Sequence, residues 1–218
     1  MHRLILNSAT WQQSSAERKD AVEVDPGNRL LWAYPRHRLE GEAIRDAALS
    51  VSGLLNLQEG GPSVYPELPS GMGALRGGWK VSAKEGRDRR SVYIFVKRNQ
   101  RYPMLEALDM PDTHESCPRR SVTTTAPQAL TLVNDRVVLE WAQAFAERVR
   151  AVKDPLAAAF QLAYGRPPDA WEKDTAATFL AKQSGVIAKE GKSAEASAAA
   201  FADFCHMLLS SNEFAYVN

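Results

Sequence analysis

Apolar residues recur every three or four positions in several stretches of the chain, which is the spacing of one face of an α-helix. The first stretch covers about residues 39–52 and ends at Gly53, a residue suited to the left-handed conformation that closes a helix. The second follows Thr125, and Gln128 three residues later completes a capping box. This pattern predicts two helices that each bury one face.

Three more helices are expected in the last third of the chain. One begins at Asp154, followed by a proline that suits the first helical position, and ends near Gly165. Another opens at Asp169, and the last covers about residues 194–209. Residues 185–200 are biased toward Ala, Lys, Glu and Ser, and we expect them to form an exposed linker into the last helix.

One stretch has the character of a β-strand, because residues 91–96 are rich in β-branched and aromatic side chains. Residues 79–82 are the expected partner of this strand. Glycine and proline interrupt residues 59–79, which we expect to form an ordered loop. Prolines interrupt residues 102–120, which we expect to be irregular. The expected fold is therefore mainly α, with one small β-hairpin and long Gly/Pro loops.

Length and composition indicate an ordinary globular chain. The 218 residues suffice for a single domain over 1–218, and the alternative is a loop-rich half with the hairpin (1–122) followed by a helical half (123–218). The net charge of +1 provides no general attraction to nucleic acid, so no nucleic-acid partner is expected. No apolar run approaches the roughly 18 residues of a membrane span.

The first residues resemble the end of a helix and lack the features of a signal peptide. Leu4, Ile5, Leu6 and Trp11 suggest an apolar face left uncovered, so we expect the chain to be the C-terminal part of a larger multidomain protein. No C-x-x-C-H motif occurs, so no haem, and no other cofactor, is expected in this chain. The two cysteines leave open a single disulfide or two small buried side chains.

Basic residues are concentrated between positions 76 and 101, where nine basic residues stand against two acidic ones. Such a segment can bind a polyanion, and an aromatic ring within it can stack on a sugar. The candidate binding residues are Arg76, Trp79, Lys80, Lys84, Arg87, Arg89, Lys97 and Arg98. For this binding role we expect Arg87 and Arg89 to lie in an exposed turn. The alternative is a solvated hairpin in which Arg90 makes an internal ion pair.

Two further groups of polar residues are candidate sites. Asp109, Asp112 and His114 lie in a proline-rimmed loop and could converge on a metal, although their spacing matches no established motif and turn formation explains them more simply. The second group could hold an acid–base pair, but a structural ion network is the favoured interpretation. Its members are Arg38, Glu40, Glu42, Arg45, Asp46, Arg119 and Arg120.

Short phrases along nearly the whole chain resemble a known family. They include His2-Arg3-Leu4-Ile5, Asp25-Pro26, Asn28-Arg29-Leu30-Leu31, Arg38-Leu39-Glu40, Gly60-Gly61-Pro62-Ser63, Arg90-Ser91-Val92-Tyr93, Pro127-Gln128-Ala129-Leu130, Gly165-Arg166-Pro167 and Ser211-Asn212-Glu213-Phe214. Together they resemble the planctomycete C-terminal domain of unknown function, called PSD-one, found in large proteins with cytochrome-c-like segments. Trp11 departs from the tyrosine usual in the family.

The resemblance implies an exported parent protein, a genomic setting associated with polysaccharide breakdown, and other domains of the parent, including a c-type cytochrome segment, as partners. It implies no active-site residue. We therefore expect a non-catalytic interaction or glycan/polyanion-binding module with acidic polysaccharide as ligand. The alternative is a polysaccharide hydrolase or lyase, assisted by a metal at the 109–117 loop; whether the chain is an enzyme stays open.

Overall fold

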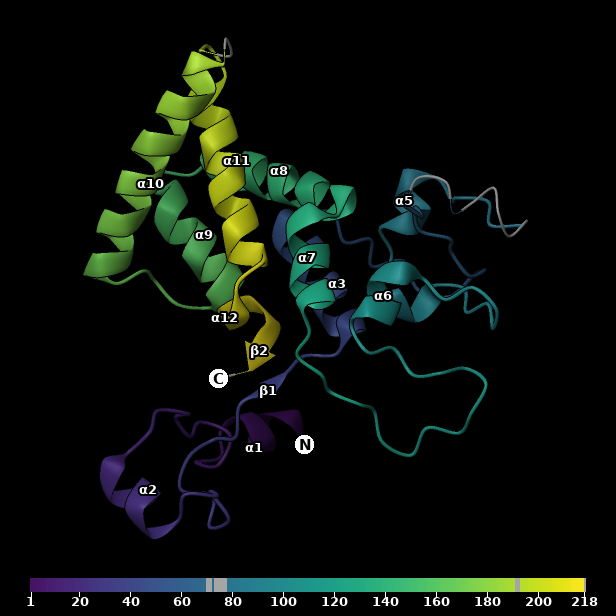
Figure 1. Ribbon diagram of the computed structural model, residues 1–218, viewed down its shortest axis with the longest axis vertical. Coiled ribbons are helices and arrows are strands. Elements are labelled where there is room, and N and C mark those ends of the chain that lie inside the picture. The colour runs from purple at the N-terminus through teal and green to yellow at the C-terminus, as the bar shows by residue number, and fades with distance from the viewer. Residues whose placement is uncertain (70–71, 73–77, 191–192, 218) are drawn as a thin grey trace.

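The computed structural model describes residues 1–69, 72, 78–190 and 193–217, and it is mainly helical (Figure 1). This confirms the predicted fold class of a mainly α chain with one small antiparallel β element. In chain order the elements are α1 (His2–Leu6), α2 (Lys19–Val24), β1 (His37–Arg38), α3 (Gly41–Ser52), α5 (Lys84–Arg87), the 3-10 turn η1 (Ser91–Tyr93), α6 (Pro103–Ala107), α7 (Ala126–Asn134), α8 (Arg136–Arg150), α9 (Pro155–Tyr164), α10 (Ala170–Lys189), α11 (Ala196–Leu209), α12 (Asn212–Ala215) and β2 (Tyr216–Val217).

The core forms where α8 packs against α11 on one side and α3 on the other. The buried face of α8 repeats at helical spacing, as the sequence pattern predicts. From α11, Phe204 and Cys205 enter the same core, and Leu49 of α3 is completely buried. Side chains from both halves of the chain therefore share one hydrophobic cluster.

The predicted helix ends are present. Gly53 closes α3 in the left-handed conformation, with φ of 77°, and Gly165 closes α9 in the same way. Thr125 and Gln128 form the capping box of α7, and Asp154 caps α9. None of the helices in the described ranges is both long and apolar enough to cross a membrane.

The predicted linker over residues 185–200 is wrong. Helix α10 continues through Gly185 to Lys189, and α11 begins at Ala196. The alanine and lysine that suggested a linker are good helix formers, and packing on α11 outweighs the cost of one glycine.

The small β element lies elsewhere than the sequence pattern suggests. The antiparallel pair is formed by β1 and β2, with His37 opposite Val217. Residues 91–93 form a 3-10 turn, and Ile94 makes an isolated bridge to Val64. The Val64 amide donates to the Tyr93 carbonyl over 2.8 Å, so this stretch finds its backbone partner in the loop near residue 64 and not at residues 79–82.

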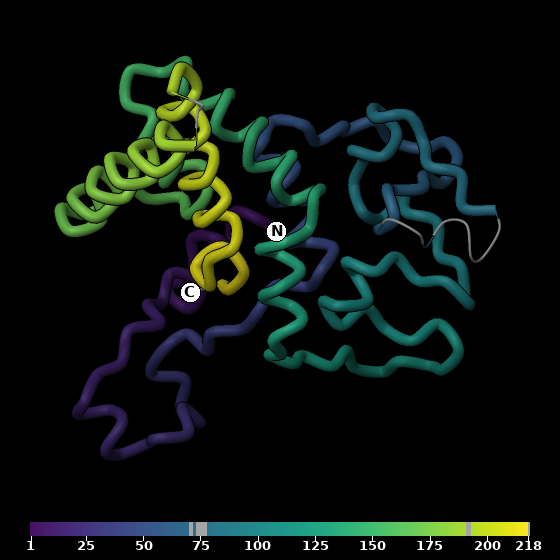
Figure 2. The backbone as a smooth tube through the Cα atoms, turned by 45° about the horizontal axis from the view of Figure 1, so that its top comes forward, coloured from purple at the N-terminus to yellow at the C-terminus, as the bar shows by residue number. Residues whose placement is uncertain are grey.

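Residues 1–36 form an N-terminal arm before β1, and the part of this arm around α2 extends away from the helical body (Figures 1 and 2). Neither α1 nor α2 contains a buried residue. The arm is held by polar bonds around Asp25, whose carboxylate accepts from the Leu30 amide over 2.7 Å. Its apolar side chains remain largely exposed: Leu4, Ile5, Leu6, Trp11, Val24, Leu30 and Leu31.

Candidate functional site

The basic segment is divided by the fold into exposed and internal cations. Lys80, Lys84 and Arg98 are exposed, and Lys97 is half-buried. Arg76 lies outside the described residues. The remaining candidates, which are considered next, are committed to contacts within the protein.

Trp79 does not meet the requirement for stacking on a sugar, so its assignment to the binding surface is corrected. The side chain is only 7% exposed and packs edge-on against Tyr65, with ring centroids 5.2 Å apart. Its indole nitrogen donates to the Pro66 carbonyl over 2.8 Å. Trp79 is thus a core residue beneath the loop.

Arg89 and Arg90 have the opposite roles to those expected. Arg89 is 3% exposed, and its guanidinium donates to the carbonyls of Gln58, Gly60 and Pro62. The turn around Gly60, whose φ is 70°, directs these carbonyls inward. The Arg90 side chain is 58% exposed and approaches Asp46 only to 4.0 Å. Arg90 is therefore the cation that faces outward.

Two neighbouring residues of α3 fix the loop that carries Arg90. Arg45 is buried, and its guanidinium donates to the carbonyls of Arg87 and Arg89 over 2.5 and 2.9 Å. Asp46 accepts from both the amide and the hydroxyl of Ser91 over 2.7 Å. Burial lowers the pKa of Arg45, and the nearby Tyr102 and Asp46 oppose that effect. This anchoring fixes the backbone on either side of Arg90 against α3.

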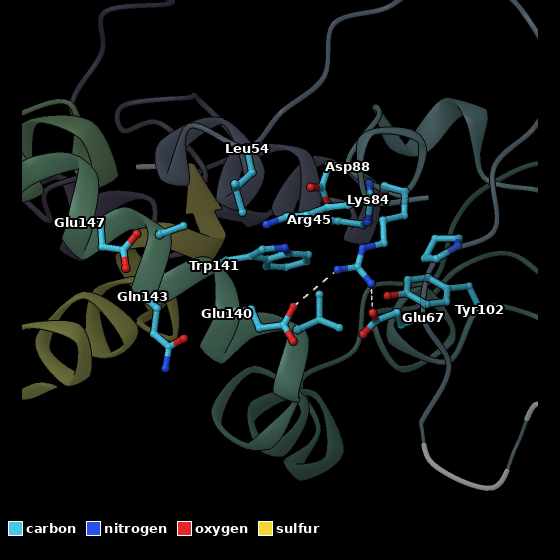
Figure 3. Close-up of a pocket in the computed structure, with 14 residues that line it drawn as sticks. Arg45, Leu54, Glu67, Lys84, Asp88, Tyr102, Glu140, Trp141, Gln143 and Glu147 are labelled. Carbon is cyan, nitrogen blue, oxygen red and sulfur yellow. Dashed lines mark hydrogen bonds and ion pairs between the residues drawn. The ribbon is translucent and has the colours of Figure 1, made fainter. Parts of the chain in front are cut away.

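A first cavity, of about 230 Å³, lies between α5 and α8 (Figure 3). Inside it the Arg87 guanidinium forms ion pairs with Glu67 and Glu140, and Arg136 contacts the same two carboxylates. Arg87 is thereby neutralised, so its expected position in an exposed turn is also corrected. The four charges fasten the loop before α5 to α8.

Asp88 faces this first cavity beside Arg45 and Lys84 (Figure 3). Burial raises the pKa of the Asp88 carboxyl, an effect that the charges of Arg87 and Lys84 oppose. A raised pKa and a place in a cavity are two features that general acids share. Sequence reasoning missed Asp88, because it counted this residue only as one of two acids in a basic segment.

A second cavity, a groove of about 420 Å³, shares the lining residue Tyr102 with the first. It is lined by Glu40, Glu42 and Asp46 of the α3 region, by Arg90, Arg101 and Arg120, and by apolar side chains that include Val92, Phe95 and Val96. Arg120 pairs with Glu42 over 2.7 Å and with Glu40 over 3.3 Å. The hydrogen bond to Glu42 raises the pKa of Arg120.

The predicted ion network is therefore found as two separate clusters. Arg120 joins Glu40 and Glu42, whereas Arg45 and Asp46 hold the loop of Ser91. Arg38 belongs to neither cluster and pairs with Asp109 over 2.5 Å. Arg119 is exposed and outside both clusters.

The loop of residues 109–117, which suggested a metal site, does not bring a set of metal ligands together. Among the residues that the structure describes, no three His, Cys, Asp or Glu side chains converge on a point. Asp109 accepts from the amide and hydroxyl of Thr123, each over 2.8 Å, and from Gln128. Burial opposes its charge, but these bonds together with Arg38 outweigh burial and lower the pKa of Asp109. Asp112 forms a local turn with the His114 amide.

Comparison with known proteins gives one positive result. No curated protein and no solved structure matches the chain. The family model PSD1, described as a protein of unknown function (DUF1553), matches residues 1–180. Since this match covers well over half of the 218 residues, the chain belongs to the PSD1 family of proteins of unknown function.

Proposed function

We propose that this chain is a non-catalytic binding module for an acidic polysaccharide. The observation that carries the proposal is the groove beside α3, where the exposed guanidinium of Arg90 shares one cavity with exposed apolar side chains. Arg101 and Arg120 line the same groove and are paired with carboxylates of the protein. Guanidinium groups recognise carboxylates and sulfates through paired hydrogen bonds, and apolar side chains can support a sugar ring. Arg98, a few residues along the chain, adds an exposed positive charge.

The arm supplies a second surface for the same kind of role. Its exposed apolar side chains, such as Trp11 at 52% and Leu30 at 78%, are typical of a surface that contacts another protein domain. We propose that the partners are other domains of an exported parent protein, including a c-type cytochrome segment, as the resemblance to multidomain relatives suggests.

The proposal is tested by retention on a sulfated polysaccharide column under a salt gradient. Attraction between exposed charges weakens as the Debye length falls from about 10 Å at 0.1 M to about 3 Å at 1 M salt. We expect the protein to be retained at low salt and released as salt rises, and the double variant Lys80→Glu/Arg98→Glu to elute earlier. Arg150→Glu/Lys153→Glu, which reverses two exposed charges at the far end of α8, is the matched control.

If the two double variants elute at the same salt concentration, the exposed charges of Lys80 and Arg98 do not contribute to polysaccharide binding. An absence of retention at 50 mM salt would contradict the module itself. Arg87 and Arg89 are unsuitable for charge reversal, because each is held inside the protein by its own partners.

A polysaccharide hydrolase is the second candidate, and Asp88 is the observation that favours it. Burial raises the pKa of this carboxyl, and Asp88 lines the same cavity as a second carboxylate, Glu140, which is paired with Arg87 and Arg136. Release of reducing ends from acidic polysaccharide by the native chain, and its loss in Asp88→Asn, would establish this activity. Unchanged polysaccharide after prolonged incubation would favour the binding module.

A further inference from the structure

The groove beside α3 has one wall that is apolar and open. Phe95 is 36% exposed, Val96 50% and Val92 73%, and all three line the cavity. One face of the Phe95 ring stacks on Tyr65, with centroids 4.9 Å apart, which fixes the ring in place. An aromatic side chain held rigidly at a cavity wall is a suitable platform for the C–H face of a sugar ring.

The groove is also lined by charged side chains of both signs. They are the carboxylates of Glu40, Glu42 and Asp46 and the guanidinium groups of Arg90, Arg101 and Arg120. Arg101 is paired with Glu106 over 2.6 Å. These charged side chains differ in their exposure and in their hydrogen bonds within the protein. Glu42 and Asp46 accept short hydrogen bonds from Arg120 and Ser91, whereas the Glu40 side chain is 61% exposed and the Arg90 side chain 58% exposed. Glu40 and Arg90 are the groups most available to a ligand.

From this arrangement we infer that the groove binds a single sugar unit that carries one carboxylate, as a uronic acid does, within an acidic polysaccharide. The inference rests on the proposed function and adds its ligand class. The Arg90 guanidinium binds the sugar carboxylate, the Glu40 carboxylate accepts hydrogen bonds from ring hydroxyls, and the ring lies against Phe95. The volume of about 420 Å³ lies within the range of small-ligand sites.

The carboxylates that line the groove favour binding of a uronic acid over binding of a sulfated sugar. A sugar with several sulfates would place its negative charges close to three carboxylates, and like charges in a partly desolvated groove repel. A uronic acid unit presents one charge for Arg90 and several hydroxyls for the carboxylates. Sulfated polymers are therefore expected to bind through the exposed lysines and arginines outside the groove, whereas a uronic acid unit enters it.

The test is calorimetric titration of the full chain with three oligosaccharides: trigalacturonate, maltotriose as the neutral counterpart, and a sulfated trisaccharide. We expect trigalacturonate to bind at least about tenfold more tightly than maltotriose, because one charge-assisted pair is worth that factor or more. We also expect its affinity to fall less between 0.05 and 0.3 M salt than the affinity of the sulfated trisaccharide, because a contact inside a groove is screened less than one at the surface.

Two variants probe the groove, each with a matched control. Phe95→Leu keeps an apolar side chain over Tyr65 but removes the flat ring, and Glu40→Gln removes an exposed charge. Each is expected to weaken trigalacturonate binding about fivefold. Trp171→Ala, at an exposed aromatic residue on α10, and Glu147→Gln, at the rim of the first cavity, should leave the affinity unchanged.

The outcomes separate this inference from the proposed function. Retention of the protein on a sulfated column without any preference for trigalacturonate would overturn the uronic acid site and leave the polyanion-binding module standing. Loss of affinity in Glu147→Gln but not in Glu40→Gln would move the ligand to the first cavity and overturn the inference. If the protein binds neither the sulfated column nor any of the oligosaccharides, both the uronic acid site and the polyanion-binding module are contradicted.

Discussion

The Arg89 guanidinium lies 3.8 Å from the centroid of the Tyr93 ring, in the geometry of a cation–π contact. The same guanidinium donates to the Gln58 carbonyl over 2.9 Å, and the Tyr93 hydroxyl accepts from the Gly60 amide over 3.0 Å. Arg89 and Tyr93 thus hold the turn of residues 58–62 from two sides. Because that turn packs next to η1, the pair also shapes the loop that carries Arg90.

The first prediction compares neighbouring arginines. Arg89→Ala leaves several carbonyls of the 58–62 turn without a donor, and we expect it to lower the free energy of unfolding by about 3 kcal/mol. Arg90→Ala removes an exposed cation with one distant partner, and should change stability by less than about 0.5 kcal/mol. Urea unfolding followed by circular dichroism measures both. Equal losses of stability in the two variants would contradict the assignment of Arg89 as an internal residue and of Arg90 as an exposed one.

The second prediction concerns Asp109. Its carboxylate joins Arg38, Thr123 and Gln128, so Asp109→Ala should destabilise the protein by about 2–4 kcal/mol at pH 7. Because the pKa of Asp109 is lowered in the folded state, its stabilisation is present above the unfolded value near 3.8 and is lost as pH falls through the folded value. The difference in stability between wild type and variant should therefore shrink below about pH 4.

Glu115, an exposed carboxylate in the same loop, provides the control for this variant. Glu115→Ala is expected to shift stability by less than about 0.5 kcal/mol at any pH in this range. If the destabilisation by Asp109→Ala stays constant from pH 7 to pH 3, the ionised carboxylate is not its source.

The third prediction concerns Asp88, whose pKa is shifted in the opposite direction from that of Asp109. Burial raises the pKa of its carboxyl, so this group supports the fold at low pH and opposes it as pH rises through the folded value. Asp88→Asn should therefore be at least as stable as wild type at pH 7 and should lose that advantage near pH 3. Thermal unfolding between pH 3 and pH 7 provides the measurement. A variant that is less stable than wild type at pH 7 would mean that the attraction of Arg87, Lys84 and Arg45 for the Asp88 carboxylate outweighs the cost of its burial.

The fourth prediction tests the arm. Since α1 and α2 contain no buried residue, Leu4→Ser/Trp11→Ser should reduce the binding of a hydrophobic dye while the midpoint of thermal unfolding stays the same. The paired control is Leu162→Ser/Val186→Ser, which removes two exposed apolar side chains from α9 and α10. A lower unfolding temperature in the arm variant would show that the arm contributes to the folded core.

Helix boundaries could be predicted from the sequence because local chemistry determines them. Thr125, Asp154 and Asp169 cap helices through their own side chains, and Gly53 ends one through its backbone conformation. None of these signals depends on distant parts of the chain.

The candidate site was harder to predict, because burial of a charged residue depends on contacts distant in sequence. Arg89 and Arg90 are adjacent and chemically identical, and contacts with the Tyr93 ring and with the carbonyls of the turn near Gly60 make Arg89 the internal one. The strand predicted over residues 91–96 failed for the same reason. Asp46, about 45 residues earlier, binds Ser91 and bends the chain into a 3-10 turn.

The central claim, that an acidic polysaccharide binds beside α3, is tested most directly by residue-resolved NMR. A ¹⁵N-labelled sample is titrated at low salt with a short oligogalacturonate, whose uronic acid units are the ligand expected in the groove. The account predicts that amide shifts move at Arg90, Phe95 and Arg98 and return as salt is raised, while the amides of α10 stay unchanged. Shifts confined to Asp88 and Glu140, or no shifts at all, would contradict it.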